Sequence, residues 1–216
     1  VNVSTGASLK LSSGLGNSIS LGQLGGAGNI LIDLSTGSLE VGDNNVNSTI
    51  SGVVSGDGGL VKTGSGELVL SNVANSFGGA RGAGLPVLKI SEGIVSVSDE
   101  RALGATQDAD SIYIENNSTL AFTDSTTLNG ARDIELSGTG GTISVVSGAT
   151  VTIPSDLIGS AQLTKSKPGT LTLTSDNPLY KGSVKVTGGD LKVSGTNPVA
   201  GKISCSGGSS DRGCIV

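Results

Sequence analysis

The carboxylates that could do chemistry in this chain lie close together in the sequence. Asp108 and Asp110 stand two residues apart in the segment TQDAD, and Asp99, Glu100 and Glu115 are near them. Residues two apart on a strand share one face, where paired carboxylates could act as general acid and base or bind a cation. The composition of TQDAD is nevertheless typical of a turn. We therefore interpret these acids as part of a solvated loop.

Other catalytic groups are missing from the sequence. The 216 residues include no histidine, so a Ser–His arrangement is impossible, and no G-x-S-x-G elbow occurs. Polysaccharide-processing solenoids need carboxylate clusters, a basic catalyst and usually aromatic platforms. Only 2% of this chain is aromatic. We expect a non-enzymatic protein without a cofactor, and a polysaccharide-processing enzyme that uses Asp108 or Asp110 is the alternative.

Two polar patterns are similar to known ligand-binding patterns. Asp43–Asn44–Asn45 could offer oxygen ligands to calcium, but the tandem nonapeptide of calcium-binding rolls is missing, and we interpret the segment as an Asx turn. The run TLTLT at Thr170–Thr174 is similar to the hydroxyl ladders of ice-binding solenoids. Such ladders need several consecutive coils, and the sequence shows only one.

The chain has two cysteines, Cys205 and Cys214, separated by the glycine-rich segment SGGSSDRG. This flexible connection lets the two thiols approach within bonding distance. Two reduced thiols in a tail are an alternative, and metal binding by two cysteines without histidine is disfavoured. We expect a disulfide, and therefore an exported protein, because disulfides persist in oxidising compartments.

Short alternating apolar runs must position these residues. Runs such as Leu39–Val41, Leu68–Leu70 and Leu171–Leu173 recur along the chain and are divided by Gly, Asn, Asp and Ser. This pattern indicates an all-β protein. Because side chains alternate along a strand, Thr172 and Val69 should point to solvent between inward leucines. The nearest approach to a helical period, Asp99–Leu103, is predicted to be a charged loop.

One sequence pattern occurs twice in the chain. LVKTGSGELVLSNVANSFGG (Leu60–Gly79) corresponds in register to LTKSKPGTLTLTSDNPLYKG (Leu163–Gly182). Repetition of this kind is typical of a solenoid, in which each unit buries its apolar face by stacking on a neighbour. We expect the matched lysines to end strands with their stems along the core, and the matched aromatic residues to pack at corners. The matched pairs include Lys62 and Lys165, Leu68 and Leu171, Leu70 and Leu173, and Phe77 and Tyr180.

The first copy is longer than the second by a glycine-rich insertion around Ala80–Pro86. Insertions in solenoids collect in loops on one face, often the face that binds a partner. This insertion and the charged loop that follows it supply the candidate binding residues. They are Arg81, Leu85, Asp99, Glu100, Arg101, Asp108 and Asp110.

Composition favours the same fold. The chain has 36 glycines, no tryptophan and no methionine, and its hydrophobic fraction of 35% is mostly small aliphatic residues. Such residues suit a long, thin core, as in a stacked parallel β-solenoid. With three strands in each coil and a spacing of about 4.8 Å, the predicted strands make roughly seven to eight coils.

The charge balance excludes two classes of partner. The net charge is −5, with a sequence pI of about 4.6, so binding to nucleic acid is not expected. The lysines are scattered, which argues against an anionic membrane surface. The sequence starts mid-strand without a methionine or a signal-peptide pattern, and we expect it to be a piece of a longer protein.

The repeated segments resemble a known family. Ile50–Gly79 and Leu163–Ser194 are similar to the passenger-associated transport repeat of autotransporters. In that repeat a sequence pattern such as SG-SGGL-K-G-GTLTLSG-N-Y-GG is followed by V-GG-L-V. Leu24–Gly42 resembles the coil that usually precedes the repeat. The second copy departs from the pattern at Lys167–Pro168 and at Pro178.

This resemblance implies a right-handed parallel β-helix exported by type V secretion. A C-terminal outer-membrane barrel in the parent chain would carry the passenger to the surface of a Gram-negative bacterium, or the passenger would be secreted. The family's passengers are adhesins, self-associating proteins, toxins or proteases. We expect an adhesin or virulence-factor scaffold that binds a host cell-surface protein or glycan, or itself. A passive stalk of a toxin is an alternative, and no catalytic residues carry over.

The domain organisation follows from these patterns. We expect a β-helix over residues 1–203, with related repeat units near 50–98 and 158–194. Residues 204–216 leave the repeat pattern, and we interpret them as a cysteine-bearing loop or cap.

Overall fold

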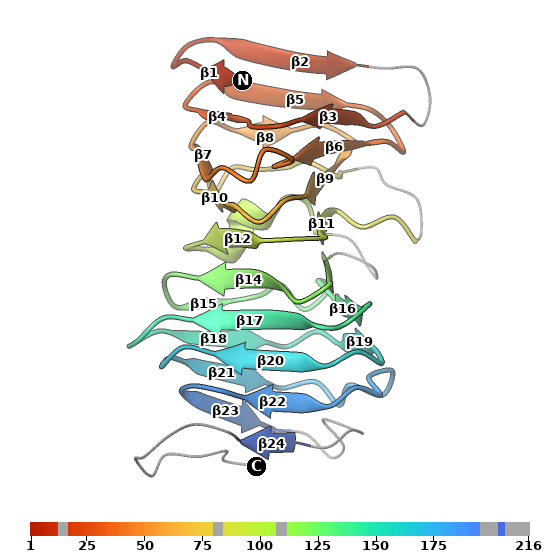
Figure 1. Cartoon of the computed structure of the whole chain (residues 1–216), viewed down its shortest axis with the longest axis vertical. Helices are drawn as coiled ribbons and strands as arrows, with labels where there is room; N and C mark the ends of the chain where they lie inside the picture. The colour runs from red at the N-terminus through yellow and green to blue at the C-terminus, as the bar shows by residue number, and fades with distance from the viewer. Residues whose placement is uncertain (13–16, 80–83, 107–111, 195–202, 206–216) are drawn as a thin grey trace.

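The computed structural model describes residues 1–12, 17–79, 84–106, 112–194 and 203–205. Within these ranges the chain forms an all-β solenoid of about eight turns, with Asn2–Val3 and Ile203–Cys205 toward opposite ends of the long axis (Figure 1). Every strand pairing is parallel. The predicted parallel β-solenoid is confirmed, whereas its handedness and the number of strands in each coil stay predictions.

Two long sheets run along the solenoid. In spatial order the ten-stranded sheet contains β1 (Asn2–Val3), β4 (Gly25–Gly26), β7 (Ser48–Ile50), β10 (Glu67–Leu70), β12 (Ile94–Val97), β14 (Ser118–Phe122), β17 (Gly141–Val145), β20 (Leu163–Ser166), β22 (Val184–Val186) and β24 (Ile203–Cys205). The seven-stranded sheet contains β3 (Ile19–Leu21), β6 (Ser38–Val41), β9 (Gly59–Lys62), β11 (Leu88–Ile90), β13 (Ile112–Glu115), β16 (Ile134–Ser137) and β19 (Leu157–Gly159).

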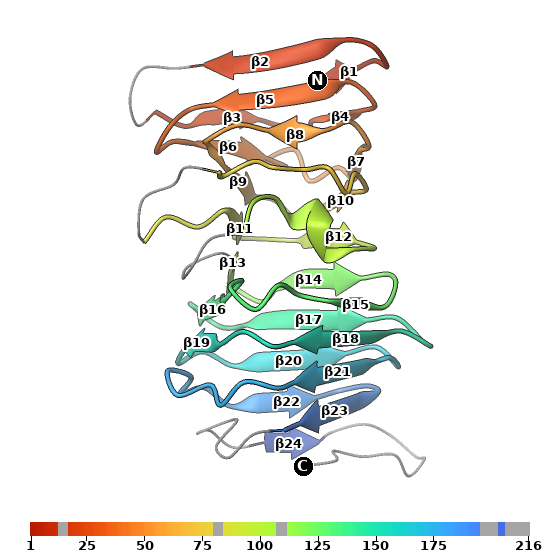
Figure 2. The same cartoon turned by 180° about the vertical axis from the view of Figure 1, so that it is seen from behind.

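Two short sheets share the remaining side, which we call the interrupted side. The three-stranded sheet contains β2 (Ser8–Ser12), β5 (Asn29–Asp33) and β8 (Val54–Ser55), and the four-stranded sheet contains β15 (Thr126–Thr127), β18 (Thr150–Ile153), β21 (Thr170–Leu173) and β23 (Asp190–Val193). Both sheets take the same place in chain order, because β5 and β18 each follow a strand of the ten-stranded sheet and precede one of the seven-stranded sheet. Figure 2 shows this side.

The core is a column of aliphatic side chains stacked in register. One row of buried residues crosses the seven-stranded sheet, and alternation along each strand sends its members inward. The row contains Leu39, Leu60, Leu88, Ile112, Ile134 and Leu157. Alternation also places Val69 and Thr172 outside, as predicted, since both are half-buried between fully buried leucines.

The two copies of the repeat occupy different sheets. The first copy forms β9 and β11 in the seven-stranded sheet and β10 and β12 in the ten-stranded sheet. The second copy forms β20 and β22 in the ten-stranded sheet and β21 and β23 in the four-stranded sheet. The first strand of the pattern therefore lies in the seven-stranded sheet in the first copy and in the ten-stranded sheet in the second copy.

Phe77 and Tyr180 lie at the equivalent corners of the two copies. Both side chains are fully buried, which confirms the predicted corner packing. The Tyr180 hydroxyl donates to the carbonyls of Ala161 and Ser183, at 2.9 Å each, and accepts from the amide of Leu163 at 3.0 Å. Burial raises the pKa of Tyr180 to about 12.

The prediction of a charged loop at Asp99–Leu103 was wrong. Glu100–Leu103 forms a short 3₁₀ helix, η1, and Asp99 caps it by accepting a hydrogen bond from the Arg101 amide at 2.9 Å. A single turn is too short to show a helical period in the sequence. In the described part of the chain, no helix is long and apolar enough to cross a membrane.

The C-terminal prediction concerns residues at the edge of the described structure. β24 pairs with β22 and ends at Cys205, whose side chain is exposed. Cys214 and the rest of residues 206–216 lie outside the described ranges. The disulfide and the cap therefore stay predictions.

Candidate functional site

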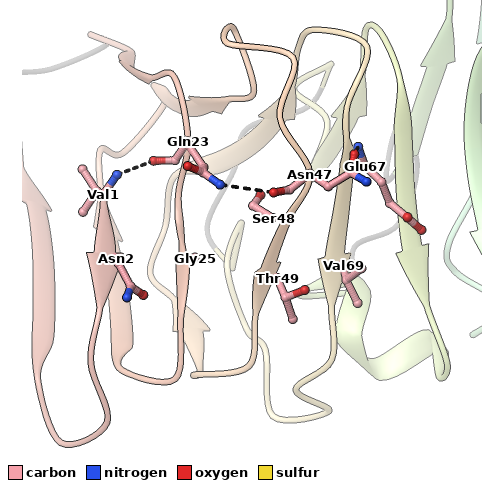
Figure 3. Close-up of a pocket in the computed structure, with 9 residues that line it drawn as sticks. All are labelled: Val1, Asn2, Gln23, Gly25, Asn47, Ser48, Thr49, Glu67 and Val69. Carbon is pink, nitrogen blue, oxygen red and sulfur yellow. Dashed lines mark hydrogen bonds between the residues drawn. The ribbon is translucent and has the colours of Figure 1, made fainter.

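A shallow polar groove crosses the outer face of the ten-stranded sheet near its N-terminal end (Figure 3). It has a volume of about 640 Å³ and extends over β1, β4, β7 and β10. Amide, hydroxyl and carboxylate side chains provide most of its lining. The lining residues are Val1, Asn2, Gln23, Gly25, Asn47, Ser48, Thr49, Glu67 and Val69.

A missing side chain creates the hollow. The strand register places Asn2 beside Gly25, and Val69 beside Thr49, in one outward-facing row (Figure 3). Gly25 leaves a gap between the side chains of Asn2 and Thr49. A Cβ atom at Gly25 would lie 3.0 Å from the Thr49 carbonyl oxygen, so the glycine also allows the close approach of β4 and β7.

A second row of polar side chains runs along one edge of the groove. The Gln23 Nε2 donates to the Asn47 carbonyl at 3.1 Å, and the Glu67 amide donates to Asn47 Oδ1 at 2.8 Å. Ser96 Oγ donates to Glu67 Oε1. These bonds hold the three side chains in place while leaving Gln23 Oε1, Asn47 Nδ2 and Glu67 Oε2 without a partner in the described structure.

The groove therefore presents donors and acceptors at fixed positions. Asn47 Nδ2 can donate, Gln23 Oε1 and Glu67 Oε2 can accept, and the Thr49 hydroxyl can do both. Among the described residues, no group of three or more His, Cys, Asp or Glu side chains is placed to hold a metal ion. The arrangement is suited to hydrogen-bonding a polar ligand.

The predicted binding residues of the η1 corner are bonded to other side chains of the same corner instead. Arg101 Nη2 and Nε donate to the two carboxylate oxygens of Asp99 at 2.8 and 2.9 Å. This hydrogen bonding lowers the pKa of Asp99 and raises that of Arg101. Glu100 accepts a hydrogen bond from Arg132 Nε at 3.2 Å. None of the three lines the groove.

Arg132 holds this corner together from inside. Its guanidinium is 1% exposed and donates to the carbonyls of Leu103, Gly104 and Ala105 and to the Thr106 hydroxyl, at 2.9–3.3 Å. Desolvation lowers the pKa of Arg132, and the charge of Glu100 opposes this effect. The corner is thus a structural network, and nothing in the sequence distinguished Arg132 from a surface arginine.

The other predicted binding residues are only partly described. Leu85 is half-buried and lies apart from the groove lining. Arg81, Asp108 and Asp110 fall outside the described residues, so their binding roles stay predictions. Asn44 Oδ1 accepts from the Val46 amide at 3.4 Å, which confirms the Asx turn predicted at Asp43–Asn45.

The prediction that Lys62 and Lys165 end strands with their stems along the core understated their burial. Both are at most 1% exposed, and their ammonium groups point inside the coil. Lys165 Nζ donates to the carbonyls of Ser166, Lys167 and Gly188 at 2.9, 2.7 and 2.9 Å. Desolvation lowers the pKa of Lys165 to about 8, while the charge of Asp190 raises it.

Lys62 makes the equivalent contacts in the first copy. Its Nζ donates to the carbonyls of Thr63, Gly64 and Glu92 at 2.5, 2.6 and 3.5 Å. Desolvation lowers the pKa of Lys62, opposed by the charge of Glu92. In both copies one acceptor comes from the next coil, so each lysine ties two coils together.

Threonines form in-register rows across consecutive coils on two outer faces. Only one coil with a threonine-bearing face was predicted from the sequence, so that prediction was wrong. Thr119, Thr142 and Thr164 pair in register on the ten-stranded sheet. Thr127, Thr152 and Thr172 do so on the four-stranded sheet. Loops of unequal length separate the members of each row, which hides the alignment in the sequence.

Comparison with known proteins gives one match. Residues 60–97 and 163–193 match the family described as the passenger-associated-transport-repeat. Searches of curated proteins and of solved structures found no match. The chain thus carries two passenger-associated transport repeats, which is consistent with an autotransporter passenger domain and implies secretion or display at the cell surface.

Proposed function

We propose that this chain, which carries two passenger-associated transport repeats, is a passenger segment that binds a host surface or other copies of itself without catalysis. The observation that carries the proposal is that both repeats form stacked coils of one continuous solenoid. A rod of this kind presents long outer faces as contact area. The repeat family also supports a location outside the cell, where such contacts are made.

The outer surface supports a binding role. The groove on the ten-stranded sheet leaves polar atoms of Gln23, Asn47 and Glu67 free to bond a ligand. The threonine rows add flat hydroxyl-bearing faces on two sheets. These features suit adhesion or self-association, because each offers hydrogen-bonding groups that the fold itself does not use.

The experiment is a binding assay with the purified chain. Labelled protein should bind epithelial cell monolayers saturably, or sedimentation should show concentration-dependent association. Replacing Ala80–Pro86 by a short glycine-serine loop, and substituting Arg101, Asp108 and Asp110 by alanine, tests the binding residues named from the sequence without removing the buried part of the η1 corner. The absence of both cell binding and self-association would overturn the adhesive function and favour a passive stalk.

A second assay tests the non-enzymatic part of the proposal. The chain is incubated with a panel of polysaccharides, and reducing ends and unsaturated products are measured. We expect no product. Product that disappears in Asp108→Asn or Asp110→Asn would overturn this part and establish the polysaccharide-processing alternative.

A further inference from the structure

We propose that the polar groove binds a neutral, linear saccharide chain that lies along the solenoid axis across β1, β4, β7 and β10. The inference rests on the proposed binding function and names its ligand class. It is carried by the geometry of the two rows of side chains in Figure 3.

The chemistry of the groove matches hydroxyl groups. A sugar hydroxyl both donates and accepts, so it needs acceptors and donors side by side. Gln23 Oε1 and Glu67 Oε2 are free acceptors, and Asn47 Nδ2 between them is a free donor. Because the other atoms of these side chains are already bonded to the protein, the free atoms are held ready at little entropic cost.

The arrangement of the groove favours a linear ligand with a repeating unit. Gln23, Asn47 and Glu67 come from successive coils, which are about 4.8 Å apart along the axis. The ligand would thus meet a polar side chain at each coil as it crosses the strands. The gap above Gly25 provides depth, and the partly exposed Val69 provides an apolar contact for the C–H face of a sugar ring.

Other ligand classes fit less well. Apart from the Val1 ammonium, which donates to the Gln23 carbonyl, the groove has a single side-chain carboxylate and no Lys or Arg, and the chain carries a net charge of −5, so an acidic ligand is disfavoured. An extended peptide binds by pairing with a free strand edge. β4, β7 and β10 are paired on both edges, and β1, the first strand of the sheet, uses its groove-side edge to pair with β4, so the groove offers only side chains.

The shallow form predicts weak binding by one groove. No aromatic side chain lines it, so apart from the contact with Val69 the ligand is held by hydrogen bonds exposed to competition by water. We expect millimolar affinity for an isolated oligosaccharide. Many passengers on one cell surface would bind a polymeric glycan much more tightly, because later contacts become intramolecular.

The test is an NMR titration of the isotopically labelled 216-residue chain with four hexasaccharides: cellohexaose, laminarihexaose, maltohexaose and chitohexaose. At least one should shift the amide signals of Gln23, Asn47 and Thr49 in a saturable manner. Thr49 is exposed within the groove, and Thr49→Phe should fill it and weaken binding by about tenfold or more. Thr150→Phe places the same ring at an exposed position of β18, on another sheet and outside both threonine rows, and should leave binding unchanged.

Three results of the titrations with the sugars would overturn the saccharide proposal. They are an absence of shifts with all four sugars, shifts that lie away from the groove, and equal binding by Thr49→Phe and the native chain. A glycine-serine octapeptide that shifts the groove signals when no sugar does so would also overturn it. The outcome is separable from the proposed function: cell binding that survives Thr49→Phe retains the adhesive passenger but removes this groove from its mechanism.

Discussion

Lys62 and Lys165 hold the same position in the two repeats and make equivalent contacts, although Lys62 lies in the seven-stranded sheet and Lys165 in the ten-stranded sheet. Each ammonium is enclosed by three backbone carbonyls, one of which belongs to the next coil. The repeat therefore specifies a local arrangement of strand, turn and lysine, and this arrangement works on either side of the solenoid.

Replacing Lys165 by methionine should destabilise the protein. The change leaves three partly buried carbonyls without their donor, and this loss is partly offset because a buried charge is removed. We expect a fall of about 1–3 kcal/mol in the free energy of unfolding, measured by urea titration. Lys185→Met on β22 is the matched control, because that side chain is half-buried and points outward. Equal effects of the two changes on the free energy of unfolding would contradict the role of Lys165 in linking two coils.

The stability contributed by Lys165 should rise with pH between 8 and 10. Its pKa is lowered from 10.5 to about 8 in the folded protein, so above pH 8 the unfolded chain binds more protons than the folded one. Unfolding then becomes less favourable as pH rises, by at most about 1.4 kcal/mol per pH unit.

The measurement is the difference in unfolding free energy between the native chain and Lys165→Met, taken at each pH. The series of measurements ends at pH 10, below the ordinary lysine pKa of 10.5 at which the rise stops. The opposite effect of Tyr180, whose pKa is raised to about 12, is common to both chains and cancels in the difference. A difference that is constant or falls from pH 8 to 10 would show that Lys165 keeps an ordinary pKa.

Arg132 and Arg101 should differ sharply in their effect on stability. Arg132→Lys cannot satisfy the carbonyls and the carboxylate that the buried guanidinium contacts, and we expect a loss of about 2–4 kcal/mol. Arg101→Ala removes only an exposed ion pair with Asp99 and should leave the melting temperature unchanged. Calorimetry of both variants decides the matter, since comparable shifts would mean that Arg132 is not the main support of the corner.

Replacing Lys167 by glycine should stabilise the protein. Lys167 has a left-handed backbone, with φ of 62°, and the equivalent residue of the first copy is Gly64, with φ of 65°. A non-glycine residue in this conformation costs about 1 kcal/mol, part of which the greater freedom of glycine in the unfolded chain cancels. Thermal melting should show a gain for Lys167→Gly and none for Lys167→Ala, and a gain for both would point to the lost side chain instead.

The sequence was sufficient to predict the strands and the fold. Alternation in runs such as Leu171–Leu173, together with the two copies of the repeat, indicated stacked parallel coils, and these features depend only on neighbours in the chain. The corner roles of Phe77 and Tyr180 followed from their matched positions. Both are confirmed by complete burial.

The groove and the buried lysines could not be predicted in the same way. The groove depends on the register of Gly25 with Asn2 and Thr49, which loops of unequal length conceal. The burial of Lys165 depends on the Gly188 carbonyl of the next coil, which is placed only by stacking. No strand was predicted at Gly25, so the sequence did not show that a glycine inside a strand allows a close backbone approach there.

The interrupted side has a mechanical consequence for a rod that holds a cell to a surface. From β8 to β15 the described residues on that side form no strands, and the Phe77 corner and η1 take their place. Tension along the axis is carried there mainly by the two long sheets and by side-chain links such as Asn75 Nδ2 to the Ala102 carbonyl. A pulled molecule should therefore yield first between β8 and β15, which would extend the tether while the coils at both ends keep their fold.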